Sequence, residues 1–379
     1  MRFLIGGDLV LDEEVLEGSN NREVLAEVLK YKEDNGVDLL VANLEAPITK
    51  SNNATKKSGP AIKQKPSEVD RMKGVDLVTL SNNHMYDYGD EGLRDTLEAL
   101  DAGGISSCGV LNKNSFYGEY IYPCDEGCVY FISVSEQEFN YSKTDEGIAS
   151  LSVLSVYDAI GKIKAKDEAS LIVVVVHGGV EFSKVPSPSL RETCRVIASF
   201  GASLVVCHHS HVVSAIESYN GVPIAYSLGN FLFEKKKAPQ GWNVGLLLDV
   251  KVDFSCGVLE VYPLLVERNP ESGVLAFLGE TASVKALDEL ENLKLIVSND
   301  ELYYDAWLTE SKSRFESYFS KLVSPVLFSG LGFAFEKLKL SKYFLFDKSL
   351  YYKLNLIRNQ SHRDVIVSGL EREYEKRNK

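Results

Sequence analysis

Short runs of apolar residues, each ending in polar or ionisable residues, recur along the first half of the chain. They are 2–8 (RFLIGGD), 37–45 (VDLLVANLE), 75–84 (VDLVTLSNNH), 171–179 (LIVVVVHGG) and 203–211 (SLVVCHHSH). Short apolar runs predict strands, and a run that is apolar throughout predicts a strand buried on both faces. Five strands that end in Asp, Glu, Asn or His predict one crowded polar edge of a sheet.

Apolar residues at helical spacing occupy much of the sequence between these strands. We expect helices near 21–34, over 91–102, around 153–165 and near 189–200, with further strands at 119–122 and 129–134. This alternation of strands and helices is typical of α/β proteins.

From residue 212 onward the pattern becomes antiparallel. Asn220-Gly221 is a hairpin signal between apolar runs, and 244–253 and 257–267 resemble a pair of neighbouring strands. We therefore expect an α/β (α+β) fold for residues 1–268, with two packed mixed sheets flanked by helices in a four-layer αββα sandwich.

Beyond Arg268 helical patterns dominate, over 283–295, 302–322 and from 333 to the end, and we expect residues 269–379 to form a helical C-terminal appendage. The stretch 322–335 has no charged residue, and Pro325 would interrupt a helix there. Two interpretations stay open for this tail: packing on the body, or peripheral contact with anionic lipid through a lysine-flanked apolar surface.

The composition is that of a soluble globular protein: 379 residues, 45% hydrophobic, 25% charged and a net charge of −13. Residues 311–379 hold 14 Lys/Arg and 7 Asp/Glu, so they carry +7 and the preceding 310 residues carry −20. So acidic a body argues against nucleic acid as a partner.

The chain enters a strand directly at Arg2, and no apolar run approaches the roughly 20 residues of a membrane span. The six cysteines show no zinc-ribbon or disulfide spacing. We expect buried, reduced thiols and a cytoplasmic protein, with the tail offering contact with the inner membrane face.

The polar strand ends predict a metal site. In an open α/β sheet, ligands bind at the carboxyl ends of the strands. Imidazole and carboxylate together suit divalent Zn, Mn or Fe. A further signal lies directly after Glu45, where residues 46–67 hold five lysines and no acid. This segment is either an electropositive flap that attracts an anionic substrate or a solvated loop; Lys56, Lys57, Lys63 and Lys65 are the candidate substrate-binding residues in it.

Six short motifs occur in the order found in the CapA family, linked to capsule and poly-γ-glutamate synthesis. They are GD (7–8), NLE (43–45), NNHxxDYG (82–89), HGGxEF (177–182), HHxH (208–211) and YSLGNF (226–231). The chain resembles that family over about residues 1–235. The family is similar to the calcineurin-like metallophosphoesterases, which implies a metallophosphoesterase-like sandwich with two divalent metal ions (Mn, Zn, Fe or Mg).

The resemblance implies roles for individual residues. The metal ligands would be Asp8, Glu45, Asn83, His177, His209 and His211, with Glu45 bridging both ions. The superfamily's DxH motif supplies a further histidine where this chain has Val10, which cannot bind a metal. Asn230 of the YSLGNF motif would contact the substrate.

His84 would lie just outside the metal ligands, as the proton donor to the leaving group. Asp87 would either orient its imidazole or cap the following helix. We expect His208 to have a structural or outer role, and His362, in the basic tail, to lie at the surface.

These residues predict a metal-dependent phosphoesterase that acts on an anionic small molecule or polymer in capsule or surface-polymer metabolism. Two alternatives stay open: amide-bond chemistry on a poly-γ-glutamate type of polymer, and a non-catalytic role in binding such a polymer during synthesis or export.

Overall fold

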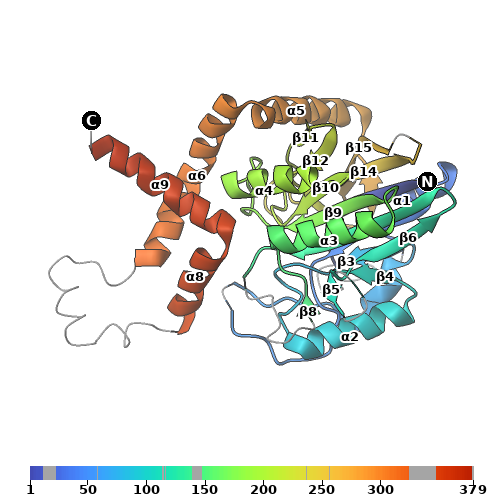
Figure 1. Cartoon of the computed structure of the whole chain (residues 1–379). Coiled ribbons are helices and arrows are strands. Elements are labelled where there is room, and N and C mark those ends of the chain that lie inside the picture. Colours follow the sequence, from blue (N-terminus) through green and yellow to red (C-terminus); the bar gives the residue numbers. More distant parts are fainter. Residues whose placement is uncertain are drawn as a thin grey trace.

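The computed structural model describes residues 1–11, 23–57, 59–112, 115, 117–138, 147–235, 237–255, 257–323 and 347–377. Two sheets pack face to face and helices cover their outer faces (Figure 1). This arrangement confirms the predicted four-layer sandwich.

The first sheet contains eight of the described strands. Their order is β16 (Leu275–Phe277), β15 (Val258–Arg268), β14 (Val244–Asp253), β1 (Arg2–Val10), β2 (Leu39–Leu44), β3 (Leu77–Thr79) and β4 (Ser106–Cys108), and β13 (Asn230–Phe233) also pairs with β1. β1 to β4 are mutually parallel, so their carboxyl ends lie at one edge. β14 and β15 form the predicted antiparallel pair.

The second sheet has the order β11 (Ile216–Tyr219), β12 (Val222–Ala225), β10 (Leu204–His208), β9 (Leu171–His177), β7 (Gly127–Ser135) and β6 (Tyr120–Cys124). β7, β9 and β10 are parallel. The hairpin predicted at Asn220-Gly221 joins β11 to β12, and both turn residues have positive φ, 51° and 83°. β5 (Val110–Leu111) and β8 (Gly147–Ile148) form a separate small pair.

Side chains that alternate along each strand build three apolar layers. Phe3 and Ile5 of β1 and Val173 of β9 point into the layer between the sheets. Leu4 of β1 packs outward beneath helices α1 (Ala26–Asp34) and α2 (Gly89–Ala102), whereas Val174 of β9 packs outward beneath α3 (Val153–Lys166) and α4 (Pro188–Ser199). Because both faces of these strands are covered, they are apolar throughout their length.

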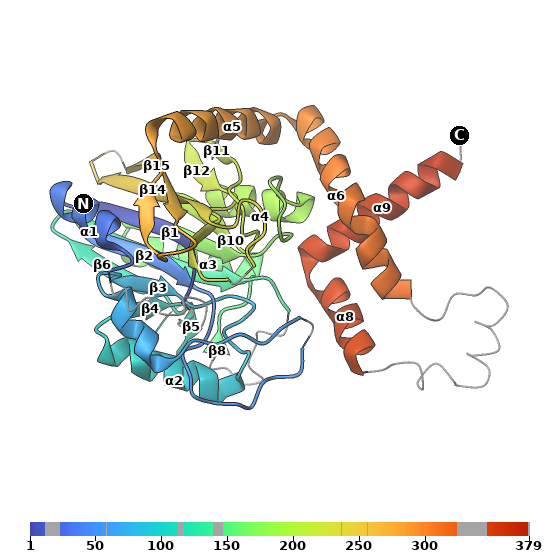
Figure 2. The same ribbon diagram turned by 180° about the vertical axis from the view of Figure 1, so that it is seen from behind.

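Three further helices, α6 (Asp300–Val323), α8 (Asp347–Arg358) and α9 (Gln360–Arg377), group at one side of the sandwich beyond α4, whereas α5 (Glu280–Ser298) runs along its edge (Figures 1 and 2). The sheet itself continues past Arg268 through β16, which pairs with β15. η1 (Pro66–Met72) is a short 3₁₀-helix between β2 and β3.

The C-terminal helices dock through a small apolar cluster. Tyr303 and Trp307 of α6 and Val365 of α9 pack against Val180 and Val185, which follow β9. Tyr303 Oη also donates a hydrogen bond to the carbonyl of Pro186, at 3.0 Å. The appendage is thus fixed to the loop that follows His177, at the carboxyl edge of the second sheet.

Most of the uncharged stretch 322–335 lies outside the described residues, and so does the proposed lipid contact. Among the helices that are described, none combines the length and the apolar character needed to cross a bilayer. The cysteines within the described residues are free thiols.

Candidate metal centre

The carboxyl ends of strands from both sheets meet and bring the six predicted ligands together. Asp8 lies within β1, Glu45 follows β2, and Asn83 follows β3. His177 is the last residue of β9, whereas His209 and His211 follow β10. All six residues are buried at the junction of the two sheets.

The acids and imidazoles form two overlapping groups of metal ligands. Asp8, Glu45 and His211 form one group, and Glu45, His177 and His209 form the other. Within each group the ligand atoms lie within 4.8 Å of one another. Glu45 belongs to both groups, and a shared carboxylate is how two cations are held a few ångströms apart.

Individual contacts agree with this grouping. His177 Nε2 lies 3.0 Å from Asn83 Oδ1 and 3.4 Å from Glu45 Oε1. His211 Nδ1 lies 3.3 Å from Asp8 Oδ2 and 3.8 Å from Glu45 Oε2. Glu45 therefore offers one carboxylate oxygen to each histidine.

A bent backbone lets residues two positions apart face the same centre. An extended strand would send His209 and His211 to opposite faces, but their φ angles are 100° and 58°. Both therefore leave the strand geometry of β10, as the HxH spacing requires. Positive φ is unusual for residues other than glycine and is found where function imposes it.

Several buried polar atoms of the centre lack hydrogen-bond partners among the described residues and are suited to bind cations. Neither carboxylate oxygen of Glu45 and neither ring nitrogen of His209 has a hydrogen-bond partner within the described part of the chain, although all are buried. Burial and the charge of Asp8 raise the pKa of Glu45 well above its ordinary value. Burial and the neighbouring His209 lower the pKa of His177. Bound cations would reverse the effect on Glu45 and reinforce the effect on His177, because they favour ionised carboxylate and neutral imidazole.

Asn43 is a supporting residue to which the sequence assigned no role. Its Nδ2 donates to Asp8 Oδ1 at 2.8 Å and lies 3.3 Å from His177 Nδ1. Its Oδ1 accepts a hydrogen bond from Thr79 Oγ1 at 3.0 Å. Asn43 therefore orients one ligand from each sheet, and its position two residues before Glu45 was the available signal.

Val10 places an apolar side chain beside the group formed by Asp8, Glu45 and His211. Val10 is 5% exposed and cannot bind a metal. The neighbouring polar group is Asn230, because β13 lies alongside β1 with Asn230 opposite Asp8. Asn230 Oδ1 lies 3.0 Å from His211 Nδ1, and its Nδ2 donates to the carbonyl of Trp242. Asn230 thus contacts a candidate ligand; its role in substrate binding stays a prediction.

His84 stands at the edge of the centre in a separate charged group. Its Nδ1 lies 2.7 Å from Asp87 Oδ2 and 3.2 Å from Lys57 Nζ, and Lys57 forms an ion pair with Asp87. Burial and the charge of Lys57 lower the pKa of His84. The side chain of Asp87 contacts the imidazole, whereas the residue preceding α2 is Tyr88, which makes no side-chain cap. Of the two sequence interpretations for Asp87, the geometry favours orientation of His84.

The profile of the family described as "Bacterial capsule synthesis protein PGA_cap" matches residues 2–235. The chain belongs to this family. It is 32% identical over 215 residues to the PGA biosynthesis protein CapA of Bacillus subtilis (strain 168), covering 54% of each chain. It is 26% identical over 303 residues to the capsule biosynthesis protein CapA of Bacillus anthracis, covering 74% of this chain and 71% of that one.

The resemblance predicted from the six motifs is therefore confirmed, and the CapA family lies within the metallophosphoesterase-like superfamily. The chain spans about half the length of the B. subtilis relative that it matches. Among solved structures, a 5'-nucleotidase from Candida albicans SC5314 covers 83% of this chain and 58% of that one, at 10% identity and a TM-score of 0.44. So distant a likeness carries no functional argument.

The lysine-rich segment of this CapA family member divides into buried and exposed positions. The side chain of Lys57 is only 5% exposed, because it pairs with Asp87. Lys63 lies over the Tyr88 ring, 5.0 Å from its centroid, and lines the cavity described below. Lys56 and Lys65 are exposed. The structure therefore brings two of the four predicted lysines, Lys57 and Lys63, toward the centre.

A cavity of about 600 Å³ opens over the metal-ligand groups. His84 and His211 lie in its wall, and so does Glu181, which had no role assigned from the sequence. Burial alone would raise the pKa of Glu181. The charges of the surrounding histidines, above all His209, outweigh burial, so the pKa of Glu181 lies below its ordinary value. The HGGxEF motif contains Glu181, so the signal was present.

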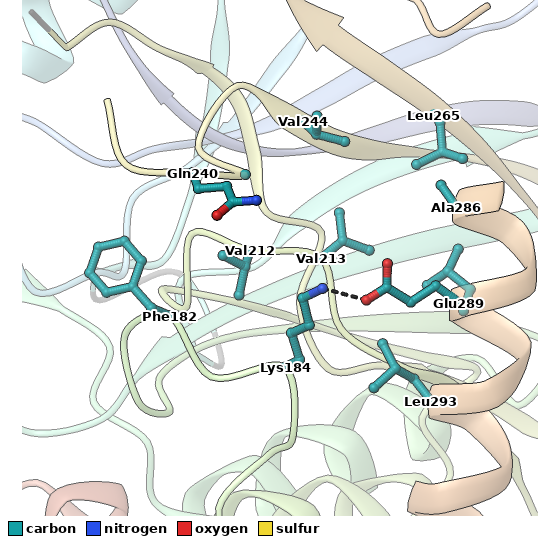
Figure 3. Close-up of a pocket in the computed structure, with 12 residues that line it drawn as sticks. Phe182, Lys184, Val212, Val213, Gln240, Val244, Leu265, Ala286, Glu289 and Leu293 are labelled. Atoms are coloured by element: carbon teal, nitrogen blue, oxygen red, sulfur yellow. Dashed lines mark hydrogen bonds and ion pairs between the residues drawn. The ribbon is translucent and has the colours of Figure 1, made fainter. Parts of the chain in front are cut away.

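A second cavity of about 490 Å³ shares Phe182 with the first and extends toward α5 (Figure 3). Its walls are largely valine and leucine side chains, and the ion pair of Lys184 and Glu289 crosses it. It contains none of the candidate metal ligands.

The structure agrees with the prediction for one of the two remaining histidines and contradicts the prediction for the other. His208 is fully buried with its Nδ1 3.6 Å from Asp8 Oδ1, which agrees with an outer role. The expectation that His362 lies at the surface is wrong, because its side chain is only 8% exposed. α9 packs against α6 and α4 and carries His362 toward His209 and Glu138. Tertiary packing of a helix distant in sequence buries it, and no local pattern reports such packing.

Proposed function

We propose that this protein is a metal-dependent hydrolase that cleaves a phosphoester in an anionic substrate of capsule or surface-polymer metabolism. The observation that carries the proposal is the pair of overlapping carboxylate–imidazole groups that share Glu45, with His84 beside them. A shared carboxylate and an adjacent proton donor are the parts that in-line displacement at phosphorus needs.

Asp8, Glu45, Asn83, His177, His209 and His211 would hold the two divalent cations, which fit the buried atoms left without hydrogen-bond partners. When bound, such ions generate a nucleophile from water and neutralise charge that develops on the phosphoryl oxygens. Asn43 keeps Asp8 and His177 in position through its carboxamide.

His84 acts as the proton donor to the leaving group. Asp87 accepts from its Nδ1, which leaves Nε2 on the far side of the ring as the donating atom. In the free protein burial and the charge of Lys57 lower the pKa of His84, but an anionic substrate in the adjoining cavity opposes the charge of Lys57 and favours the protonated imidazole.

Selection of an anionic substrate is assigned to the lysines at the cavity. Lys63 and Lys235 both line it. In a protein of net charge −13 they give the entrance a local positive field that concentrates anions. Screening by salt would weaken this attraction, since both side chains lie at the solvent boundary.

A second candidate is non-catalytic binding of an anionic polymer. The observation that favours it is Val10, which leaves the group of Asp8, Glu45 and His211 without the superfamily's further histidine. The names of the two Bacillus relatives, a PGA biosynthesis protein and a capsule biosynthesis protein, also fit amide-bond chemistry on a polymer of glutamate.

One experiment separates these functions. The protein is purified without chelators and reconstituted with Mn²⁺, Zn²⁺ or Fe²⁺, and its metal content is measured. It is then assayed on panels of phosphomonoesters, phosphodiesters and γ-glutamyl peptides. Phosphoester turnover that is lost in Glu45→Gln supports the proposal. Turnover of peptides alone supports amide chemistry, and metal-dependent polymer binding without turnover supports the non-catalytic role. Less than half a metal per chain contradicts the metal centre itself.

A further inference from the structure

A third group of potential metal ligands lies beside the two that contain Glu45. It consists of Glu138, His209 and His362, whose ligand atoms lie within 4.8 Å of one another. The same limit holds for the members of the two other groups. The three residues are 7%, 2% and 8% exposed, so all of them are buried.

Three distant parts of the chain supply this group. Glu138 follows β7, His209 follows β10, and His362 lies in the first turn of α9. The family profile ends at residue 235, so His362 lies beyond the segment that carries the family motifs. The C-terminal helices thus contribute to the polar centre, besides packing against the body.

Hydrogen bonds fix the two outer members in place. Asn359 Nδ2 donates to Glu138 Oε1 at 3.0 Å, and Asn359 Oδ1 accepts from the backbone N–H of His362 at 2.9 Å. The His362 ring stands edge-on to the Tyr318 ring of α6, with centroids 5.2 Å apart. One carboxamide therefore sets the positions of both the carboxylate and the helix that bears the imidazole.

The first turn of α9 is anchored independently of these contacts. Ser361 Oγ donates to Glu136 Oε1 at 2.8 Å and lies 2.7 Å from Ser187 Oγ. Asp364 accepts from the backbone N–H of Ser189 at 2.8 Å. Because several contacts hold the first turn of α9, the backbone position of His362 is fixed by the fold.

We propose that Glu138, His209 and His362 form a third divalent-cation site, next to the two-metal centre and dependent on the C-terminal helix α9. One carboxylate and two imidazoles are a donor set that suits Zn²⁺ and leaves a fourth position open. The carboxylate of Glu181 lies nearby and adds to the negative field that favours a cation.

The inference rests on the proposed metal centre only through His209, which both share. An imidazole has two ring nitrogens, and neither nitrogen of His209 has a hydrogen-bond partner within the described residues. One ring can therefore serve both sites.

The test counts cations in the full chain. Apoprotein is reconstituted with Zn²⁺ alone, dialysed, and its zinc measured per chain, and crystals are examined for anomalous scattering at each site. The variants are Glu138→Gln, which keeps an acceptor for Asn359, and His362→Phe, which keeps a ring against Tyr318. Glu136→Gln is the matched control, since it makes the same change two residues away and lies outside the group.

We expect three zinc ions in the wild type and in Glu136→Gln, and two in each of the other variants, with the peak beside α9 missing. Equal zinc content in all four proteins would overturn the third site while leaving the two-metal centre intact. Loss of every ion in Glu138→Gln or His362→Phe would also overturn it, because the residues would then belong to one undivided centre. A wild type that binds no zinc would contradict both the third site and the proposed function.

Discussion

At the scale of single residues, the centre combines side chains whose ionisation is set by their surroundings. Asp8 and Glu45 are both fully buried, yet their pKa values move in opposite directions. Burial raises both, but His211 and His208 more than offset this at Asp8, whereas Glu45 also feels the charge of Asp8. Such paired and opposed shifts are typical of functional sites.

His84 gives the sharpest prediction at this scale. We expect His84→Ala to keep both metals and lose roughly 10²- to 10⁴-fold in kcat, the usual contribution of general acid catalysis. The loss should be largest for substrates with poor leaving groups, because these need the proton most. Steady-state kinetics on phenyl phosphate esters of graded leaving-group pKa, with metal analysis of the same samples, provide the measurement. If the variant loses metal, His84 is a ligand and its assignment as proton donor fails.

Glu136 predicts a pH dependence of stability. Burial raises its pKa to about 7, although Ser361 and the N–H of Gly179 donate to it. In the unfolded chain the carboxyl loses its proton near pH 4.5. Between these two pH values the folded state binds more protons than the unfolded state. Stability therefore falls as the pH rises through this window, by about 3 kcal/mol in total.

Glu136→Gln should remove this dependence. Urea unfolding between pH 4.5 and pH 8 is expected to show a difference in unfolding free energy, variant minus wild type, that increases with pH and levels off above about 7. A difference that stays constant across this range would show that the carboxyl does not keep its proton in the folded state.

At the scale of elements, the segment between β2 and η1 holds one lysine at the cavity and another in the interior. Lys63 faces the cavity, whereas Lys57 is buried against Asp87 and His84. The electropositive flap expected from the sequence therefore includes an internal ion pair, since a lysine next to a buried carboxylate is pulled inward. Its role in substrate binding stays a prediction for the remaining lysines.

We expect Lys57→Met to lower the unfolding free energy by about 3–5 kcal/mol, because it leaves the carboxylate of Asp87 buried without its cation. Lys56→Met is the matched control, and as an exposed position it should change stability by about 0.5 kcal/mol or less. Urea denaturation of the two variants measures the contrast. Equal midpoints would show that the Lys57–Asp87 pair does not stabilise the fold.

At the scale of the whole molecule, the centre joins the two sheets and the C-terminal helices. The groups that contain Glu45 take candidate ligands from both sheets, so bound cations would cross-link the sheets at their carboxyl edge. A ligand that binds only the folded state stabilises it by about 2.7 kcal/mol at a concentration of 100 Kd. Metal binding should therefore affect global unfolding as well as local geometry.

We expect reconstitution with Zn²⁺ or Mn²⁺ to raise the midpoint of thermal unfolding by several degrees over the apoprotein, and by more as free metal increases. Glu45→Gln, which removes the shared carboxylate, should abolish most of this rise. Differential scanning calorimetry at several metal concentrations gives the measurement. An unfolding temperature that does not respond to metal in the wild type would argue against cations that bridge the sheets.

By itself, the sequence determined the layers and most of the candidate centre. Fully apolar runs such as 171–176 are possible only for strands covered on both faces, and Asn220-Gly221 fixes a hairpin through its backbone preferences. Asp8, Glu45 and His177 were found because strand ends are local features, and parallel strands must bring such ends to one edge.

Only the tertiary structure decided which distant residues join that edge. Asn43 supports two ligands, Lys57 turns inward to Asp87, and His362 reaches the centre from a helix more than 150 residues beyond His209. No periodicity or motif reports these contacts, because they depend on how separate elements pack. The burial of His362 follows from Trp307 and Val365 docking α6 and α9 on the loop after β9, which is a property of the assembled core.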